Sequence, residues 1–160
     1  GAALETGHEY ARMIGADFVL HFDGDGQFSV ADIAPALAAL EKKEADILFG
    51  SRFLDKKSPV PFVKKNILLP LARLFQNFFV GIKLTDAHNG FRILNKLALG
   101  TINITQDRMA HATEIVEQVK AVGLTYIEFP VSVVYRRYGQ GIRGGLKIIT
   151  DLILGKLVNK

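Results

Sequence analysis

The sequence has 160 residues, of which 49% are apolar and 22% are charged, values that suit one globular domain with a substantial core. It contains no cysteine, which excludes disulfides and thiolate metal sites. No run of 18 apolar residues occurs, and the first residues do not resemble a signal peptide, so the sequence predicts neither a standard transmembrane helix nor a secretion signal.

Charge is distributed unevenly along the chain. Residues 53–85 and residues 136–160 each carry six basic side chains against one acidic side chain, whereas the remaining 102 residues have a net charge of −6. Two basic zones on an acidic body indicate a polyanionic partner, and nucleic acid and an anionic membrane surface are both candidates. Both zones are also apolar, which favours the membrane over nucleic acid.

The first third of the chain alternates helical and strand-like patterns. Gly15 is expected to end the first helix, and Ser29 is expected to cap the second. The pattern predicts a helix over 2–14, a strand over 18–22 buried on both faces, a helix over 30–43, and a second buried strand over 45–52. This order is typical of a largely parallel sheet.

The motif with the clearest chemistry, Asp23-Gly-Asp-Gly-Gln27, directly follows the first predicted strand. Ligands of open α/β sheets bind just beyond the carboxyl ends of strands, so Asp23 and Asp25 are expected at a binding site. Two carboxylates on one turn suit a hard cation such as Mg²⁺ or Mn²⁺. A strand-ending Asp-Gly turn accounts for the same residues, and the local sequence does not separate the two interpretations.

The rest of the chain predicts two amphipathic helices, about 62–83 and 145–160, each either a core helix or an interfacial membrane helix. A polar turn over 86–92 leads into a strand-like run, and Gly123 ends a helix over 113–122. A strand is expected over 126–135, where Pro130 indicates an edge position or a bulge.

Taken together, these motifs resemble the catalytic domain of family 2 glycosyltransferases, and most closely the branch that contains dolichol-phosphate mannose synthase and polyprenyl-phosphate glycosyltransferases. The resemblance runs along nearly the whole chain. Its blocks, in order, are Gly1 to Leu4, Asp23 to Gln27, Gly50-Ser51-Arg52, Asp86 to Arg92, Glu114, and Phe129-Pro130-Val131 with Arg137 and Gln140. The family implies the GT-A fold, in which helices flank a Rossmann-like, mixed, mostly parallel sheet.

The chain departs from the family pattern at two places. Residues 139–143 lack the Ser and Lys that usually end the basic turn of the family. The family also begins with nucleotide-binding strands that this sequence does not contain; at about 30 residues per βα unit they would occupy roughly 60–70 residues before Gly1. We therefore expect an N-terminally truncated single domain over 1–160, starting at the third helix of the family and inactive by itself.

The resemblance implies a role for each matched residue. Asp23, Asp25 and Gln27 are expected to bind the metal, and Asp86, Arg92 and Asp25 to form the catalytic group. The donor phosphates are expected to contact Asp23, Arg52, Arg137 and Gln140. Asp86 would orient the acceptor or the sugar, or serve as the base if the acceptor is a hydroxyl. A turn-capping role accounts equally for Asp86.

The implied activity is a metal-dependent, inverting transfer of a hexosyl group from a nucleotide-diphosphate sugar to polyprenyl or dolichyl phosphate. Such an enzyme would be peripheral at the cytoplasmic face of a membrane; a homo-oligomer is compatible with it, and no nucleic acid is involved. Two alternatives stay open: a family 2 transferase with a polysaccharide or other hydroxyl acceptor, cytoplasmic if that acceptor is soluble, and a non-catalytic fragment.

Overall fold

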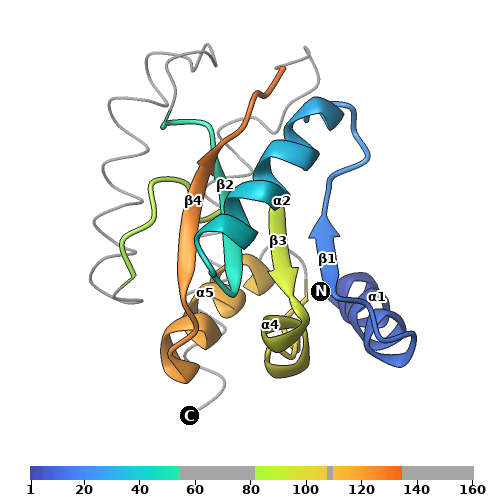
Figure 1. Ribbon diagram of the computed structural model, residues 1–160. Helices are drawn as coiled ribbons and strands as arrows, with labels where there is room; N and C mark the ends of the chain where they lie inside the picture. The colour runs from blue at the N-terminus through green and yellow to red at the C-terminus, as the bar shows by residue number, and fades with distance from the viewer. Residues whose placement is uncertain (55–81, 108–109, 135–160) are drawn as a thin grey trace.

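The structure is a computed structural model, and it describes residues 1–54, 82–107 and 110–134. The expected helix over 145–160 and nearly all of that over 62–83 lie outside these residues, as do Arg137 and Gln140. The described elements are, in chain order, α1 (Ala2–Met13), β1 (Phe18–His21), the 3₁₀ helix η1 (Val30–Asp32), α2 (Ile33–Lys42), β2 (Ile47–Ser51), β3 (Arg92–Asn95), α4 (Lys96–Thr101), α5 (Ala110–Val122) and β4 (Tyr126–Pro130) (Figure 1).

The described strands form one mixed sheet in the order β1-β3-β2-β4. Strand β3 pairs antiparallel with both β1 and β2, and β4 pairs parallel with β2. Strands β1, β2 and β4 therefore point the same way, upward in Figure 1, and β3 runs against them. The expectation of a mostly parallel sheet is wrong for these pairings, because β3 inserts between two strands that follow each other in the sequence.

Strand β1 lies at an edge of the described sheet, with β3 as its partner there. The expectation that it is buried on both faces is wrong, since the Phe18 side chain is 38% exposed and only His21 is buried. Strand β2 is buried at every position, as predicted for 45–52. Strand β4 lies at the opposite edge of the described sheet, one of the two positions that Pro130 indicated. It ends at that proline, so the expected strand over 126–135 is too long for the described residues 131–134.

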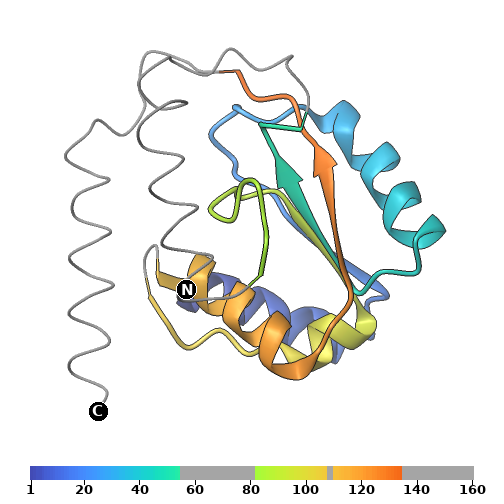
Figure 2. The same ribbon diagram turned by 90° about the vertical axis from the view of Figure 1, so that its left-hand side faces the viewer.

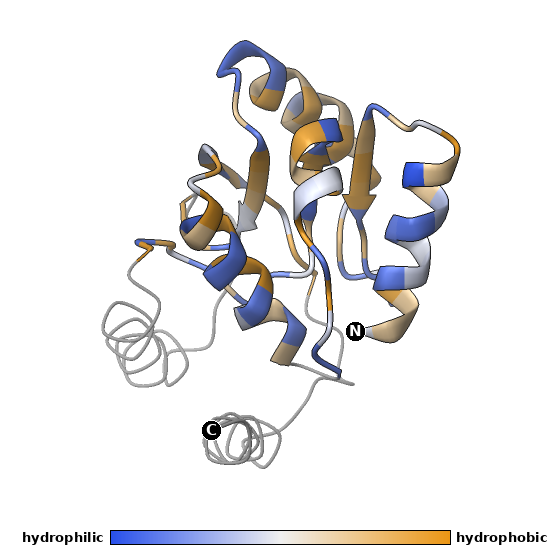
Figure 3. Cartoon of the chain, turned by 90° about the horizontal axis from the view of Figure 1, so that it is seen from below, coloured by the Kyte–Doolittle hydropathy of each residue, from blue (hydrophilic) through white to orange (hydrophobic). Residues whose placement is uncertain are grey.

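The sheet separates two apolar cores, because successive side chains of a strand point to opposite faces. Ile47 and Phe49 of β2 pack on the face covered by α4 and α5, whereas Leu48 packs on the face covered by α2. Figure 2 shows the sheet between α2 on one side and α1, α4 and α5 on the other. The strands in Figure 3 are hydrophobic along most of their length, whereas the helices combine hydrophobic and hydrophilic residues.

Local signals account for most of the helix ends. Gly15 and Gly123 have φ values of +69° and +75°, the left-handed conformation that glycine adopts most readily after a helix. The Ser29 hydroxyl accepts a hydrogen bond from the Ala31 amide at 3.3 Å, as the predicted cap requires. Helix α4 was not predicted from the sequence; it is capped by Asn95, which accepts from the Ala98 amide at 2.8 Å. None of the described helices is long and apolar enough to cross a membrane.

Candidate active site

Three loops lie at the same end of the sheet, the end toward which β1, β2 and β4 point, upward in Figure 1. His21 at the end of β1 and Phe49 near the end of β2 are both register partners of Arg92, the first residue of β3. The loop after β1, Arg52 after β2 and the turn before β3 therefore lie close together. Ligands of α/β sheets usually bind at the carboxyl ends of the strands, so this end of the sheet is the candidate site.

Asp23 lies directly against the turn before β3. A Cβ atom placed on Gly90 would lie 2.1 Å from Oδ2 of Asp23 and 2.8 Å from Oδ1, well inside van der Waals contact. Asp23 is nevertheless exposed to solvent. This contact brings the loop that carries Asp23 and Asp25 to the turn that carries Asp86.

Asp25 shapes its own loop. Its Oδ1 atom accepts a hydrogen bond from the Gln27 amide at 2.9 Å, and Gly26 between them has a φ of +73°. The Gln27 carbonyl in turn accepts from the Val134 amide at 2.9 Å, which ties the loop to the segment after β4. Asp25 is exposed, so its second carboxylate oxygen is available at the surface.

The loop fits one kind of metal site better than another. No group of three or more His, Cys, Asp or Glu side chains able to hold a metal occurs in residues 1–54, 82–107 and 110–134. A site supplied entirely by such side chains, as for structural zinc, is therefore not present in this part of the chain. Two exposed carboxylates suit Mg²⁺ or Mn²⁺, which complete their coordination with waters and substrate phosphates.

Asp86 and Arg52 form a bidentate ion pair. Arg52 donates from Nε to Oδ2 at 2.6 Å and from Nη2 to Oδ1 at 2.7 Å, and its backbone amide donates to Oδ2 at 3.1 Å. The side chain of Asp86 is 3% exposed and that of Arg52 is 26% exposed. Two parallel charge-assisted bonds fix the position and plane of the guanidinium at the surface of the site.

The turn before β3 is held by Asn89, which sequence reasoning did not single out. Its Nδ2 donates to Oδ2 of Asp86 at 3.0 Å, and its Oδ1 accepts from the Phe91 amide at 2.9 Å. Asn89 is 3% exposed. It therefore connects Asp86 to the first residues of β3, and the Asn-Gly dipeptide was the sequence signal that could have found it.

Arg92 lies beneath the site rather than at its surface. Its side chain is 1% exposed, packs over the Phe49 ring at 6.0 Å, and donates from Nη2 to the Ala87 carbonyl at 3.2 Å. Burial lowers the pKa of Arg92 to about 10, against the opposing effect of the negative charges of Asp23 and Asp86. The guanidinium stays charged near neutral pH and lies close enough to both aspartates to interact with them.

Hydrogen bonds among Thr85, Glu128 and Ser51 hold the backbone next to Arg52. Thr85 donates from its amide and its hydroxyl to Oε1 of Glu128, both at 2.6 Å, and its hydroxyl lies 2.6 Å from that of Ser51. Next to Ser51, a Cβ on Gly50 would lie 2.9 Å from Cβ of Phe91. Gly50 and Ser51 of the Gly50-Ser51-Arg52 block thus serve close packing and hydrogen bonding.

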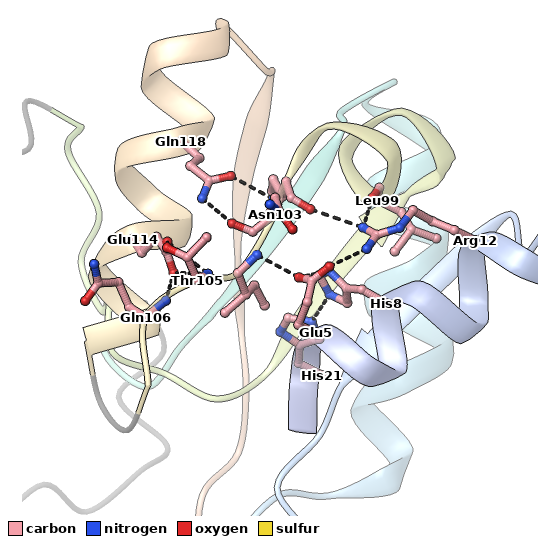
Figure 4. Close-up of polar contacts among 12 residues, drawn as sticks. Glu5, His8, Arg12, His21, Leu99, Asn103, Thr105, Gln106, Glu114 and Gln118 are labelled. Atoms are coloured by element: carbon pink, nitrogen blue, oxygen red, sulfur yellow. Dashed lines mark hydrogen bonds and ion pairs between the residues drawn. The ribbon is translucent and has the colours of Figure 1, made fainter. Parts of the chain in front are cut away.

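A separate polar cluster, made of Glu5, His8, Arg12 and His21, lies between α1 and β1 (Figure 4). The Nε2 atoms of His8 and His21 are 2.7 Å apart, and both side chains are buried. Burial, reinforced by the charges of Arg92 and His8, lowers the pKa of His21 to about 3. Burial also lowers the pKa of His8. Both imidazoles are therefore neutral near pH 7, and one donates to the other.

Figure 4 also shows Glu114, one of the matched family positions. Its carboxylate accepts hydrogen bonds from the amides of Thr105 and Gln106 at 2.9–3.0 Å, so it holds the segment before α5. Glu114 therefore has a loop-capping role. At the same end of the sheet, near the carboxyl ends of β1 and β2, the structure places Asp23, Asp25, Gln27, Arg52, Asp86 and Arg92.

Comparisons with known proteins give relatives but no family model, since none matches the chain. It is 30% identical, over 98% of its length, to a UDP-N-acetylglucosamine–dolichyl-phosphate N-acetylglucosaminyltransferase of Methanococcus voltae. It is 28% identical, again over 98%, to an uncharacterized protein of Methanocaldococcus jannaschii. The low-salt glycan biosynthesis hexosyltransferase Agl6 of Haloferax volcanii is 26% identical over 79% of the chain.

The relatives are longer than this chain. It spans 65% of the Methanococcus voltae protein, 68% of the Methanocaldococcus jannaschii protein and 32% of the Haloferax volcanii protein. The two relatives whose names state an activity are glycosyltransferases. The chain is thus similar along 98% of its length to one named glycosyltransferase and along 79% of its length to another.

Proposed function

We propose that the protein that contains this chain is a metal-dependent, inverting glycosyltransferase of family 2 with a GT-A fold. It transfers a hexosyl group from a nucleotide-diphosphate donor to a polyprenyl or dolichyl phosphate at the cytoplasmic face of a membrane. The observation that carries the proposal is the contact between Asp23 and Gly90. It brings the loop with the exposed aspartates next to the turn that carries Asp86 and its partner Arg52, at one end of the sheet. The similarity to a dolichyl-phosphate transferase supports the choice of acceptor.

In this proposal the site holds a diphosphate between carboxylates and a guanidinium. Asp23 and Asp25, with Gln27, hold a Mg²⁺ or Mn²⁺ ion, which supplies Lewis-acid stabilisation of the departing diphosphate when bound. Arg52 contacts the same phosphates, with its plane fixed by Asp86. The buried charge of Arg92 favours an anionic ligand and offsets the charge of the aspartates.

The transfer itself needs little proton chemistry. An acceptor phosphate oxygen attacks the anomeric carbon from the face opposite the donor phosphate, and the bond from that carbon to the diphosphate oxygen breaks. The diphosphate leaves with the bonding electrons, and the configuration at the anomeric carbon inverts. Because the attacking oxygen is already anionic near neutral pH, no residue has to remove a proton.

The surroundings of Asp86 favour this acceptor over a hydroxyl. Its carboxylate accepts two bonds from the Arg52 side chain, one from the Arg52 amide and one from Asn89, and it is nearly buried. A general base must reach the proton that it removes, and these bonds already occupy most of the accepting positions of Asp86. A positioning role for Asp86 therefore agrees with the geometry better than the role of a base.

The proposal is tested with the full-length protein, UDP-N-acetylglucosamine and other labelled nucleotide sugars, and two kinds of acceptor. Dolichyl phosphate in detergent or vesicles is compared with a hydroxyl-bearing oligosaccharide, each with Mn²⁺ and with a chelator. We expect metal-dependent formation of a lipid-linked sugar with inverted anomeric configuration. Transfer to the oligosaccharide alone would replace the lipid acceptor by a hydroxyl acceptor, and no transfer with any donor would contradict the proposal.

A further inference from the structure

Gly90 occupies a position where glycine is not demanded by the backbone. The glycines with positive φ in the described residues are Gly15, Gly26 and Gly123, and Gly90 is not among them. A left-handed φ is therefore not the reason for a glycine here, and the reason lies in the space around it. That space is filled by the carboxylate of Asp23, whose three nearest atoms would lie 2.1, 2.6 and 2.8 Å from an added Cβ.

The turn that carries Gly90 is held firmly on both sides. Asn89 bonds to Asp86 through its side chain and through its amide, which donates to the Asp86 carbonyl at 3.2 Å. On the other side, Phe91 donates to Asn89, and its carbonyl accepts from the Gly50 amide at 2.8 Å. Asn89 and Phe91 are also buried. The backbone of Gly90 therefore cannot withdraw without breaking buried hydrogen bonds.

Asp23, in contrast, is exposed and lies in a loop, so its side chain can move, and the cost of moving it is a weaker attraction to the buried charge of Arg92. A methyl group at position 90 would displace the Asp23 carboxylate rather than the turn. We propose that Gly90 is a positioning residue: its missing side chain sets where the Asp23 carboxylate lies relative to Arg92 and Asp86, and hence where the metal–diphosphate group binds. This inference rests on the proposed function for its catalytic consequence, but the contact between positions 23 and 90 can be tested independently of activity.

The activity test uses the full-length protein with Gly90→Ala, and Gly100→Ala as the matched control. Gly100 lies in α4, and an added Cβ would meet nothing within 4 Å. Gly90→Ala is expected to raise the Mn²⁺ concentration for half-maximal transfer about 10-fold or more, in the range seen when a residue that orients metal ligands is removed. Gly100→Ala is expected to change this value less than 2-fold. Equal values for the two variants would overturn the inference.

A double-mutant cycle on thermal stability separates this inference from the proposed function. Gly90→Ala should lower the Tm by a few degrees when residue 23 is Asp, and by less than half as much in the Asp23→Ala protein, because the crowding carboxylate is then absent. The same Tm loss in both backgrounds would overturn the inference, even in an active enzyme. Strong coupling in a protein that transfers no sugar would support the positioning and contradict the function.

Poor folding of Gly90→Ala also gives a result. If this variant does not fold but Gly90→Ala combined with Asp23→Ala does, the contact between the two positions is confirmed. If neither folds, the space at Gly90 is needed for a reason other than Asp23, and the inference is wrong.

Discussion

Two polar groups near the end of β1 differ sharply in their surroundings, although they are two residues apart. His21 is 4% exposed and bonds to His8 in the interior, whereas Asp23 is exposed and lies against Gly90. The cluster around His21 is built from bonds within the protein, which is typical of a structural role. The carboxylates after β1 present oxygens to solvent, which is typical of a site that binds a ligand.

The other two residues of this cluster, Glu5 and Arg12, are partly buried and show what this structural role is. Arg12 donates to the carbonyls of Leu99 at 3.0 Å and Ile102 at 3.3 Å and pairs with Glu5. Glu5 in turn accepts from the Ile104 amide at 2.6 Å. Although burial opposes it, these bonds and the charge of Arg12 lower the pKa of Glu5. The cluster thus attaches α1 to α4 and to the segment that follows α4.

The largest effect is expected when one charge is removed from the exposed loop after β1. Asp25→Asn in the full-length protein should reduce turnover on the order of 100-fold, because one charged metal ligand is lost. Its Tm should stay close to that of the wild type, because Asp25 is exposed. Asp17→Asn is the matched control, an exposed aspartate at the other end of β1. Equal activity of the two variants, measured with labelled donor, would remove Asp25 from the metal site.

The opposite pattern is expected for the buried cluster. Arg12→Ala should lower the free energy of unfolding by about 1–3 kcal/mol, because the Leu99 and Ile102 carbonyls lose their donor. The half-saturating concentration of Mn²⁺ should not change. Urea denaturation checks the first expectation, with Lys120→Ala, at an exposed position of α5, as the control. If Arg12→Ala shifted the metal requirement without a loss of stability, the two regions would not have separate roles.

Acid should act on the buried cluster through His21. Its folded pKa of about 3 is below the ordinary value of 6.5, so between these limits the unfolded chain binds a proton that the folded chain excludes. Stability should therefore fall as the pH decreases below about 6.5, by up to about 1.4 kcal/mol per pH unit for this one group. Unfolding free energies measured from pH 7 to 5 should show a smaller slope for His21→Gln than for the wild type. An unchanged slope would show that His21 is not the group responsible.

The weakest expected effect concerns the membrane. The basic, apolar zones at 62–83 and 145–160 should bind the protein to vesicles with anionic lipids at low salt, and release should be partial at high salt. Co-sedimentation with anionic and with neutral vesicles measures this binding. Absence of binding to anionic vesicles at low salt would favour the other interpretation of these segments, as core helices.

Local sequence predicted much of the fold and of the candidate site. The strand before Asp23, the buried strand before Arg52, and the helix ends at Gly15 and Gly123 follow from short-range rules, because apolar runs and glycines act on their own neighbours. The insertion of β3 between β1 and β2 depends on pairings between distant residues, which no local pattern encodes.

Long-range contacts also explain what was missed at the site. Two contacts join residues from separate elements: the hydrogen bond between His8 and His21, and the contact of the Asp23 carboxylate with Gly90. No local sequence pattern around any one of these residues indicates its partner. Arg92 was expected in the catalytic group, but it is buried beside Phe49, and no local pattern indicates that burial. Asn89 was missed for a similar reason, because its role depends on the hydrogen bonds that it makes to Asp86 and Phe91 in the folded turn.

The most direct test of the central claim measures Mn²⁺ binding to the full-length protein by electron paramagnetic resonance, with and without UDP. The account predicts that wild type and Asp17→Asn bind one Mn²⁺ ion whose affinity increases when UDP is present, because the diphosphate supplies further oxygen ligands. It predicts that Asp23→Asn and Asp25→Asn each lose this UDP-dependent binding while both proteins stay folded. Mn²⁺ and UDP binding that is equally strong in all four proteins would contradict a metal site in the loop after β1.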